Sequence, residues 1–181
     1  MRVIGTVGLA GSGKGEFANV AEETGVPVVT MGDVIRGECR DRGLDPAEHH
    51  GRVARDLRAE NGPTAIAEAS LPHIEAALED DDAVLVDGIR SDDEVDAFEE
   101  RFGDRFTLVS IETPFEVRER RLGERGRDNV GEGGEDGESL AERDDRELGF
   151  GLGAAMDRAD RTIENTGTLA AFREQVWEVL G

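Results

Sequence analysis

Cysteine, lysine and long apolar runs are almost absent from this sequence. Cys39 is the one cysteine among 181 residues, so a disulfide within the chain and a thiolate metal cluster are both excluded. We expect Cys39 to pack as a small apolar side chain. No apolar run approaches the roughly 20 residues that cross a bilayer, and the first nine residues lack the charged and then apolar plan of a signal peptide. The sequence therefore predicts a soluble, cytoplasmic protein with no membrane partner.

Basic residues are half as frequent as acidic ones. There are 21 Lys and Arg against 42 Asp and Glu, which gives a formal net charge of -21. Lys14 is the sole lysine, and this arginine bias with excess carboxylates is typical of a halophilic protein, because molar salt screens the repulsion among the carboxylates. Strong negative charge argues against nucleic acid as the main partner, since a phosphate backbone needs clustered cations. Any anionic ligand therefore needs a local basic pocket.

The order of apolar runs predicts a single α/β domain. A length of 181 residues is within the usual range for one domain. Short apolar runs are found at 2–9, 26–30, 83–86, 106–111 and 161–164. Helical patterns lie between and after them, at 16–23, 33–42, 46–60, from Pro63 onward, and at 169–180, where Leu169, Phe172, Val176 and Leu180 are expected in the core. This alternation is typical of a parallel sheet covered by helices.

A glycine-rich segment joins the first predicted strand to the first predicted helix. Its residues follow the order G-x-x-x-x-G-K and are Gly8, Leu9, Ala10, Gly11, Ser12, Gly13 and Lys14. Glycines let several backbone N–H groups converge on phosphate oxygens, and the helix N-terminus and the lysine add positive charge at the same place. We therefore predict that Gly8 to Gly15 bind the phosphates of ATP, with Lys14 taking part in catalysis.

The residue after the lysine departs from the usual phosphate loop. Ser or Thr normally stands there and its hydroxyl meets Mg²⁺, whereas this chain has Gly15. The metal must then be held by another group. Asp87 ends a predicted strand beside the loop and is placed to orient Mg²⁺, directly or through water. As a turn residue before Gly88, Asp87 also has a purely structural alternative.

Several segments resemble nucleotide kinases. Gly15 gives the G-K-G of adenylate kinase, although Glu16 replaces that family's Thr. The segment 31–36 resembles the start of the acceptor-binding helix in nucleoside monophosphate kinases, and 86–90 is similar to their Asp-Gly-x-x-Arg run with one residue fewer. The segment 159–167 resembles the loop that contacts adenine. The chain as a whole resembles an archaeal P-loop ATP-binding family related to adenylate kinase and dephospho-CoA kinase.

This resemblance implies a fold and a division of roles. The implied fold is a three-layer P-loop NTPase domain of the nucleotide-kinase type, with an acceptor-binding helical segment at about 31–62 and a small lid at about 126–148. Arg36 and Arg90 would clamp the phosphoryl acceptor. Asp33 matches the proposed base of dephospho-CoA kinase and would take the proton of an acceptor hydroxyl, which a phosphate acceptor does not require. Asp33 has an equally good structural explanation as a helix N-cap.

Arginines are concentrated on both sides of a glycine-rich stretch at 131–137. They are Arg118, Arg120, Arg121, Arg125, Arg127, Arg143 and Arg146. In a kinase they would form two arms of a lid that closes over the transferred group, with Arg121 and Arg143 acting on the phosphoryl group. The alternative is a set of exposed ion pairs with Glu119, Glu124, Asp144 and Asp145. Nucleic-acid binding survives only if the cluster forms a continuous exposed stripe.

Other catalytic arrangements find no support in the sequence. The histidines, His49, His50 and His73, lack metal-ligand spacing and are expected at the surface. Neither a serine nucleophile elbow nor the Ser-His-Asp order occurs. The leading hypothesis is a kinase that uses ATP and Mg²⁺ to phosphorylate a nucleotide or a nucleotide-containing metabolite. The alternative is an ATP-binding switch with little turnover, whose lid closure signals to a protein partner. The acceptor and the oligomeric state stay open.

Overall fold

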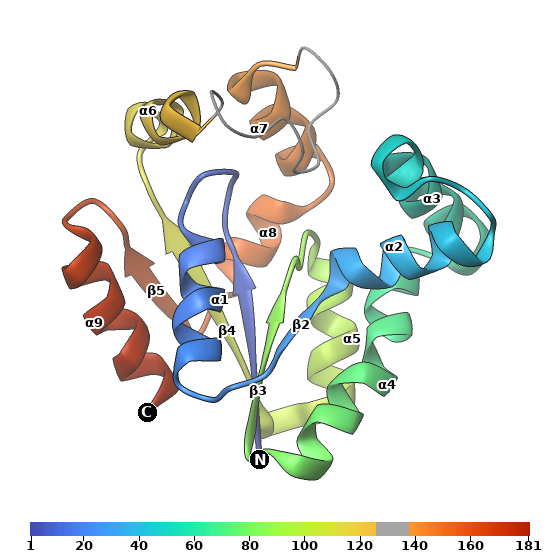
Figure 1. The fold of residues 1–181 in the computed structure, drawn as a ribbon, viewed down its shortest axis with the longest axis horizontal. Helices are drawn as coiled ribbons and strands as arrows, with labels where there is room; N and C mark the ends of the chain where they lie inside the picture. The colour runs from blue at the N-terminus through green and yellow to red at the C-terminus, as the bar shows by residue number, and fades with distance from the viewer. Residues whose placement is uncertain (126–137) are drawn as a thin grey trace.

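The protein forms a parallel sheet with helices on both faces. The computed structural model describes residues 1–125 and 138–181, and Figure 1 shows its ribbon. The sheet has the strand order β2-β3-β1-β4-β5, and every pair of neighbours is parallel. Its strands are β1 (Arg2–Val7), β2 (Val28–Thr30), β3 (Ala83–Asp87), β4 (Phe106–Glu112) and β5 (Arg161–Glu164). The α/β fold class expected from the sequence is confirmed.

The helices include the five that the sequence analysis placed, with small shifts at their ends. They are α1 (Lys14–Glu23), α2 (Met31–Asp41), α3 (Pro46–Asn61), α4 (Ala65–Asp80), α5 (Asp92–Phe102), α6 (Phe115–Arg125), α7 (Leu140–Gly149), α8 (Leu152–Asp157) and α9 (Leu169–Leu180), with a 3-10 turn at Gly103–Arg105. None in the described ranges is long and apolar enough to span a membrane.

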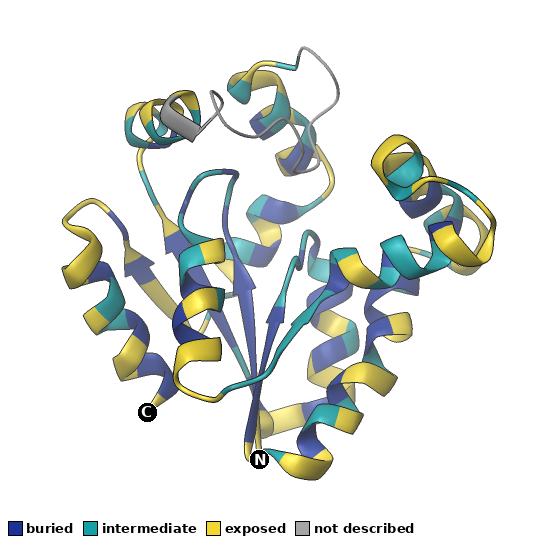
Figure 2. Ribbon diagram, in the orientation of Figure 1, coloured by how far each residue is buried: buried dark blue, intermediate teal, exposed yellow. Residues whose placement is uncertain are grey.

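Two hydrophobic layers lie on opposite faces of the sheet. Alternate strand residues such as Ile4 and Val109 face α1 and α9, while Val3 and Leu108 face the helices of the opposite layer. Both faces of the central strands β1, β3 and β4 are covered, so these strands read as nearly continuous apolar runs and appear as the buried centre of the molecule in Figure 2. Cys39 is fully buried in one of these layers, as expected for a small apolar side chain.

The carboxyl ends of the strands gather the polar residues of interest. β1 lies between β3 and β4, and its residue Thr6 is paired with Asp87 at the end of β3. The glycine loop after β1 lies at this edge, below α6 and α7 in Figure 1. The α2–α3 arm extends from the same edge at the side of β3. The site is therefore built where parallel α/β sheets usually bind ligands.

Three expectations about single residues are wrong. Helix α2 starts at Met31 and its N-cap is Thr30, so Asp33 is not the cap, because the helix begins two residues earlier than its apolar pattern indicated. Leu169 is 59% exposed because it is the first residue of α9, before the helix packs on the sheet. His49 and His50 are half-buried on α3, with His50 next to Gly32 of α2, and only His73 is exposed as expected.

Candidate active site

The loop between β1 and α1 has a backbone that requires glycine. Gly8, Gly11 and Gly13 have φ angles of 153°, 78° and 120°, a region that L side chains rarely adopt. A Cβ on Gly8 would lie 2.7 Å from the carbonyl oxygen of Ile111 and 2.7 Å from Ser12 Oγ. The strand, turn and helix predicted from the motif are therefore all present, with the free N–H groups of α1 at the loop.

Lys14 folds back across this loop. It is the first residue of α1, and its Nζ donates to the carbonyl oxygens of Gly8 at 2.5 Å and Leu9 at 3.1 Å. Burial lowers the pKa of the Lys14 ammonium, the carboxylates of Asp87 and Glu147 raise it, and the guanidiniums of Arg90 and Arg143 lower it. These four side chains come from two parts of the chain, the end of β3 with the turn after it and helix α7. Lys14 is thus at the centre of a charged cluster on the strand edge.

The far side of the loop is clamped by the ends of β4 and β5. The carbonyl oxygen of Ser12 accepts from Asn165 Nδ2 at 2.8 Å and from Thr113 Oγ1 at 2.9 Å. Asn165 is 6% exposed, and a Cβ on Gly13 would collide with its Nδ2. Arg121 Nη2 donates to the backbone oxygen of Asn165 at 3.3 Å and to Oδ1 at 3.2 Å. Arg121, predicted to act on phosphate, is therefore also part of this clamp.

Asp87 is turned toward the loop by its neighbour on β1. Thr6 Oγ1 donates to Asp87 Oδ1 at 3.0 Å, and Gly88, with a φ of 104°, makes the turn that follows. The metal-orienting role and the turn role are thus compatible. Gly15 is exposed with nothing within 4 Å of its Cβ position. Among residues 1–125 and 138–181, no group of three or more His, Cys, Asp or Glu side chains could hold a metal ion.

The segments predicted to bind the acceptor carry arginines that are each paired with a carboxylate. Arg36 Nε donates to Asp33 Oδ1 at 2.8 Å on the exposed face of α2. Arg58 of α3 donates to Glu94 at 3.0 Å, and the backbone N–H of Arg90 donates to the same carboxylate at 2.8 Å. Glu94 is fully buried at the start of α5. The two predicted acceptor arginines thus come from different segments. Arg36 belongs to α2, and Arg90 belongs to the turn between β3 and α5.

His50 lies among these arginines. Burial lowers the pKa of its imidazole, the nearby backbone of Gly32 raises it, and the guanidiniums of Arg36, Arg90 and Arg58 lower it. Its Nε2 is buried without a hydrogen-bond partner, next to the backbone of Gly32. The imidazole is therefore favoured in its neutral form.

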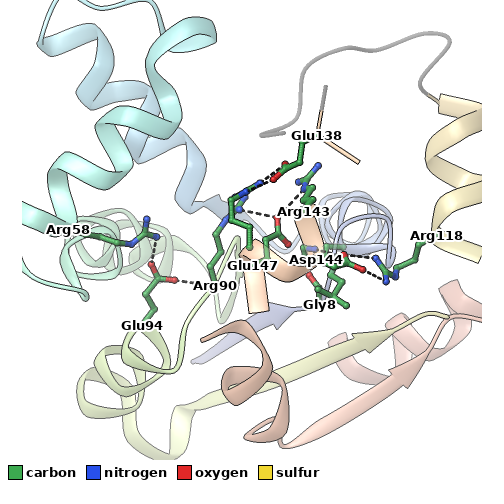
Figure 3. Close-up of polar contacts among 12 residues, drawn as sticks. Gly8, Arg58, Arg90, Glu94, Arg118, Glu138, Arg143, Asp144 and Glu147 are labelled. Atoms are coloured by element: carbon green, nitrogen blue, oxygen red, sulfur yellow. Dashed lines mark hydrogen bonds and ion pairs between the residues drawn. The ribbon is translucent and has the colours of Figure 1, made fainter. Parts of the chain in front are cut away.

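Arg118 has a role that neither predicted alternative describes. It is 3% exposed and makes a bidentate pair with Asp144 at 2.9 and 2.6 Å. Its Nη1 also donates to the backbone oxygen of Ala10 at 3.1 Å, and its Nε to that of Thr113 at 3.1 Å. The alternative to a lid was a set of exposed ion pairs, but the Arg118–Asp144 pair is buried and ties α6 and α7 to the glycine loop (Figure 3).

The other arginines of the cluster do not line up. Arg143 Nε donates to Glu147 Oε1 at 3.0 Å, and Arg146 pairs with Glu138 at 2.7 Å. Arg120 is exposed. The side chains of Arg125 and Arg127 and the predicted lid tip at 131–137 are outside the described residues. The described arginines, with Arg118 buried and Arg121 turned to Asn165, do not form a continuous exposed stripe.

A cleft of about 420 Å³ continues from the glycine loop toward the ends of β4 and β5. Its walls include Leu9, Ser12, Thr113, Arg118, Met156 and Thr166. Ser12 Oγ is buried and has no hydrogen-bond partner. The volume falls in the range of small-molecule sites.

The sequence analysis did not predict the contacts of four side chains at this site: Glu94, Asp144, Glu147 and Asn165. Glu94 stands in an acidic run that reads as a solvated surface. Asp144 and Glu147 lie three residues apart in a helix that begins at Ser139, whose capping box with Glu142 is a usable signal for the helix start. Their common face was recognisable only once the position of α7 was known.

Comparison with known proteins gives consistent results. A family model described as an AAA domain matches residues 7–136. A UPF0200 protein of Halobacterium salinarum is 58% identical over 180 residues, covering 99% of this chain and 93% of the relative. A UPF0200 protein of Methanothrix thermoacetophila is 46% identical over 181 residues, covering 99% and 97%.

Solved structures show the same fold at low sequence identity. A Thermus thermophilus protein has a TM-score of 0.66 at 20% identity, over 99% of this chain and 96% of the other. The shikimate kinase of Bacteroides thetaiotaomicron has a TM-score of 0.60 at 16% identity, over 99% and 98%. The kinase-like P-loop architecture expected from the sequence is thereby confirmed.

Proposed function

Because the chain belongs to the UPF0200 family of archaeal P-loop proteins, we propose that it is a Mg²⁺-dependent kinase of a small molecule. The proposed reaction transfers the γ-phosphoryl group of ATP to a nucleotide or a nucleotide-containing metabolite. The observation that carries this proposal is the glycine loop with Lys14 folded across it, together with Arg90 and Arg143, which share the carboxylate of Glu147 and whose charges act on Lys14. Phosphoryl transfer depends mainly on positioning and on neutralising charge on phosphate oxygens, which such a cluster supplies.

The nucleotide side of the proposal uses the loop and the adjoining cleft. Backbone N–H groups of Gly8 to Gly15 would hold the phosphates, and Lys14 would leave the carbonyl oxygens of its own loop to contact them. The cleft beside Thr113 and Thr166 would take the nucleoside. Bound Mg²⁺ would neutralise charge on the phosphates. With Gly15 offering no hydroxyl, Asp87 would hold it, directly or through water.

The acceptor side lies between α2, α3 and the turn after β3. Arg36 and Arg90 are both partly exposed, with side-chain exposures of 40% each, so a bound anion can reach them. Asp33, with a side-chain exposure of 67%, would accept a proton if the acceptor is an alcohol. Its present partner is Arg36, which an anionic acceptor would draw away.

The proposal is tested by ADP production from ATP and Mg²⁺ in molar KCl. Parallel reactions contain nucleoside monophosphates, dephospho-CoA, shikimate, or no acceptor; shikimate is included because the structural neighbours include shikimate kinases. ADP that appears only with one acceptor supports the kinase and names its substrate class. Lys14→Ala is expected to abolish ATP binding while the fold persists. Unchanged ATP affinity in that variant would contradict the loop assignment.

A second candidate is an ATP-binding switch with negligible turnover. The observation that favours it is the pairing on the acceptor side, where Arg36, Arg58 and Arg90 already have the carboxylates of Asp33, Glu94 and Glu147 as partners. ATP binding without ADP release in the presence of any of the acceptors would favour the switch. A protein partner would then bind differently to the ATP-bound and the ATP-free protein.

A further inference from the structure

Glu147 is a buried carboxylate placed between the two halves of the site. It is 5% exposed and lies on α7. Its Oε1 accepts from Arg90 Nη1 at 3.3 Å and from Arg143 Nε at 3.0 Å, and Figure 3 shows it between these two arginines. The geometry thus places one carboxylate on two guanidiniums, and its charge also raises the pKa of the Lys14 ammonium at longer range.

This arrangement has the charge pattern of a bound phosphoryl group. A phosphate presents several oxygens to guanidinium and ammonium groups at once, and Arg prefers such bidentate or shared contacts. In the absence of phosphate, Arg90 and Arg143 would repel one another and the nearby Lys14. A carboxylate that belongs to the chain removes this repulsion, but it becomes a like charge beside any phosphate that arrives.

Resting on the proposed kinase function, we propose that Glu147 is a positioning residue whose carboxylate holds Arg90 and Arg143 beside Lys14 and is exchanged for a phosphoryl group on binding. The exchange involves ion pairs only, and no covalent bond forms or breaks. Through this exchange, Arg90 and Arg143 become available together, because the phosphoryl group takes the place of Glu147 as their partner.

Asp144, one turn earlier on the same helix, shows why Glu147 is the exchangeable member. The Asp144 pair with Arg118 is closed to solvent, with side-chain exposures of 11% and 4%. The Glu147 pair with Arg90 has an open side, because the Arg90 side chain is 40% exposed. A ligand can therefore approach Arg90 while Asp144 keeps α7 attached to the glycine loop. Helix α7 has one fixed anchor and one replaceable anchor.

The experiment compares anion affinity in wild type and Glu147→Gln by titration calorimetry with inorganic pyrophosphate and with ATP in molar KCl. We expect Glu147→Gln to bind both ligands about five- to tenfold more tightly, because a competing like charge is gone and the shape is kept. The matched control is Asp145→Asn, which removes the same charge from an exposed position on the same helix and should leave both affinities unchanged. A purely structural role of Glu147 predicts weaker binding instead. Equal or weaker binding by folded Glu147→Gln overturns the proposal.

A thermal measurement covers the case in which the variant is unstable. If the anion replaces the carboxylate, pyrophosphate will raise the melting temperature of Glu147→Gln by more than it raises that of wild type. An equal or smaller rise, or a chain that does not fold even with saturating pyrophosphate, overturns the exchange. Failure of the proposed function looks different: wild type would then bind neither ATP nor pyrophosphate. Wild-type binding without a gain in the variant rejects only the role of Glu147.

Discussion

The proposed nucleotide side and the proposed acceptor side of this site are held by different kinds of contact. The glycine loop is fixed by backbone carbonyls, by the buried amide of Asn165 and by the buried guanidinium of Arg118. The acceptor side is held by ion pairs whose arginines are partly exposed, such as Arg36 and Arg90. Buried, fully bonded groups resist displacement, whereas exposed ion pairs contribute little and exchange readily. The difference suggests a rigid phosphate cradle facing an adjustable acceptor pocket.

The largest expected effect on ligand binding comes from Gly13→Ala, which breaks the rigid side. The added Cβ meets Asn165 Nδ2 and forces a strained backbone, so the loop must move away from its clamp. We expect ATP affinity to fall by about a hundredfold, since a cost of about 2.7 kcal/mol falls on the binding-competent loop. Calorimetric titration with ATP measures this.

Gly25→Ala is the matched control for that change. Gly25 also has a positive φ, of 80°, but nothing lies within 4 Å of its Cβ position, and it is outside the site. It should lower stability by about 1 kcal/mol and leave ATP affinity intact. A similar loss of ATP affinity in both variants would show that backbone strain alone, and not the Asn165 clamp, matters.

The second effect is on stability and concerns Asp144→Asn. This change leaves the Arg118 guanidinium buried without its counter-ion, which typically costs about 3–5 kcal/mol. The wild-type pair is 4% and 11% exposed, so little solvent screening reduces the cost. Urea unfolding at constant KCl measures it. Asp145→Asn should stay within about 0.5 kcal/mol of wild type, and an equal effect of the two changes would contradict the anchoring of α7.

The third change, Arg90→Ala, sharpens the contrast between the two sides. We expect the efficiency of acceptor use to fall by about ten- to a hundredfold, the usual loss for one charge-assisted contact, with ATP affinity changed far less. Steady-state kinetics with varied acceptor, next to ATP titration, separates the two quantities. Equal losses for ATP and acceptor would move Arg90 to the nucleotide side.

The smallest effect is a change in pH dependence at His50. Its folded-state pKa is lowered from 6.5, chiefly by burial, so the unfolded chain binds the proton more readily. The stability present above pH 6.5 is therefore lost as the pH falls from 6.5 through the lower folded pKa. His50→Gln should lose less stability than wild type between pH 7 and pH 5 in urea unfolding. His73→Gln, at the exposed histidine of α4, is the control, and identical curves for all three proteins would contradict the effect of burial.

Sequence reasoning succeeded where local pattern determines structure. The order of strands and helices follows from apolar runs separated by helical stretches, and the loop from Gly8 to Lys14 follows from residues adjacent in the chain. The strand at 161–164 and the helix at 169–180 have the bounds that the sequence indicated. Such features depend on near neighbours, whose periodicity is visible in one sequence.

The acceptor side and α7 depend on contacts between distant segments. Arg118 meets Asp144 across 26 positions, and Arg90 meets Glu147 across 57. No periodicity links such pairs, and 35% of the chain is charged, so each arginine has many candidate partners. Glu94 illustrates the difficulty, because it follows two aspartates in an acidic run and is nevertheless fully buried. Its partner Arg58 lies 36 positions away.

The single lysine of the chain allows the glycine loop to be labelled selectively. Because every other cationic side chain is an arginine or histidine, Lys14 is the only side-chain primary amine. An amine-selective acylating reagent that modifies a side chain would thus label the phosphate loop and no other side chain. The folded-back ammonium, held by the carbonyl oxygens of Gly8 and Leu9, would be shielded further by a bound nucleotide. Mass spectrometry of the intact chain would then measure nucleotide occupancy as the loss of this side-chain label, without a radioactive substrate or a known acceptor.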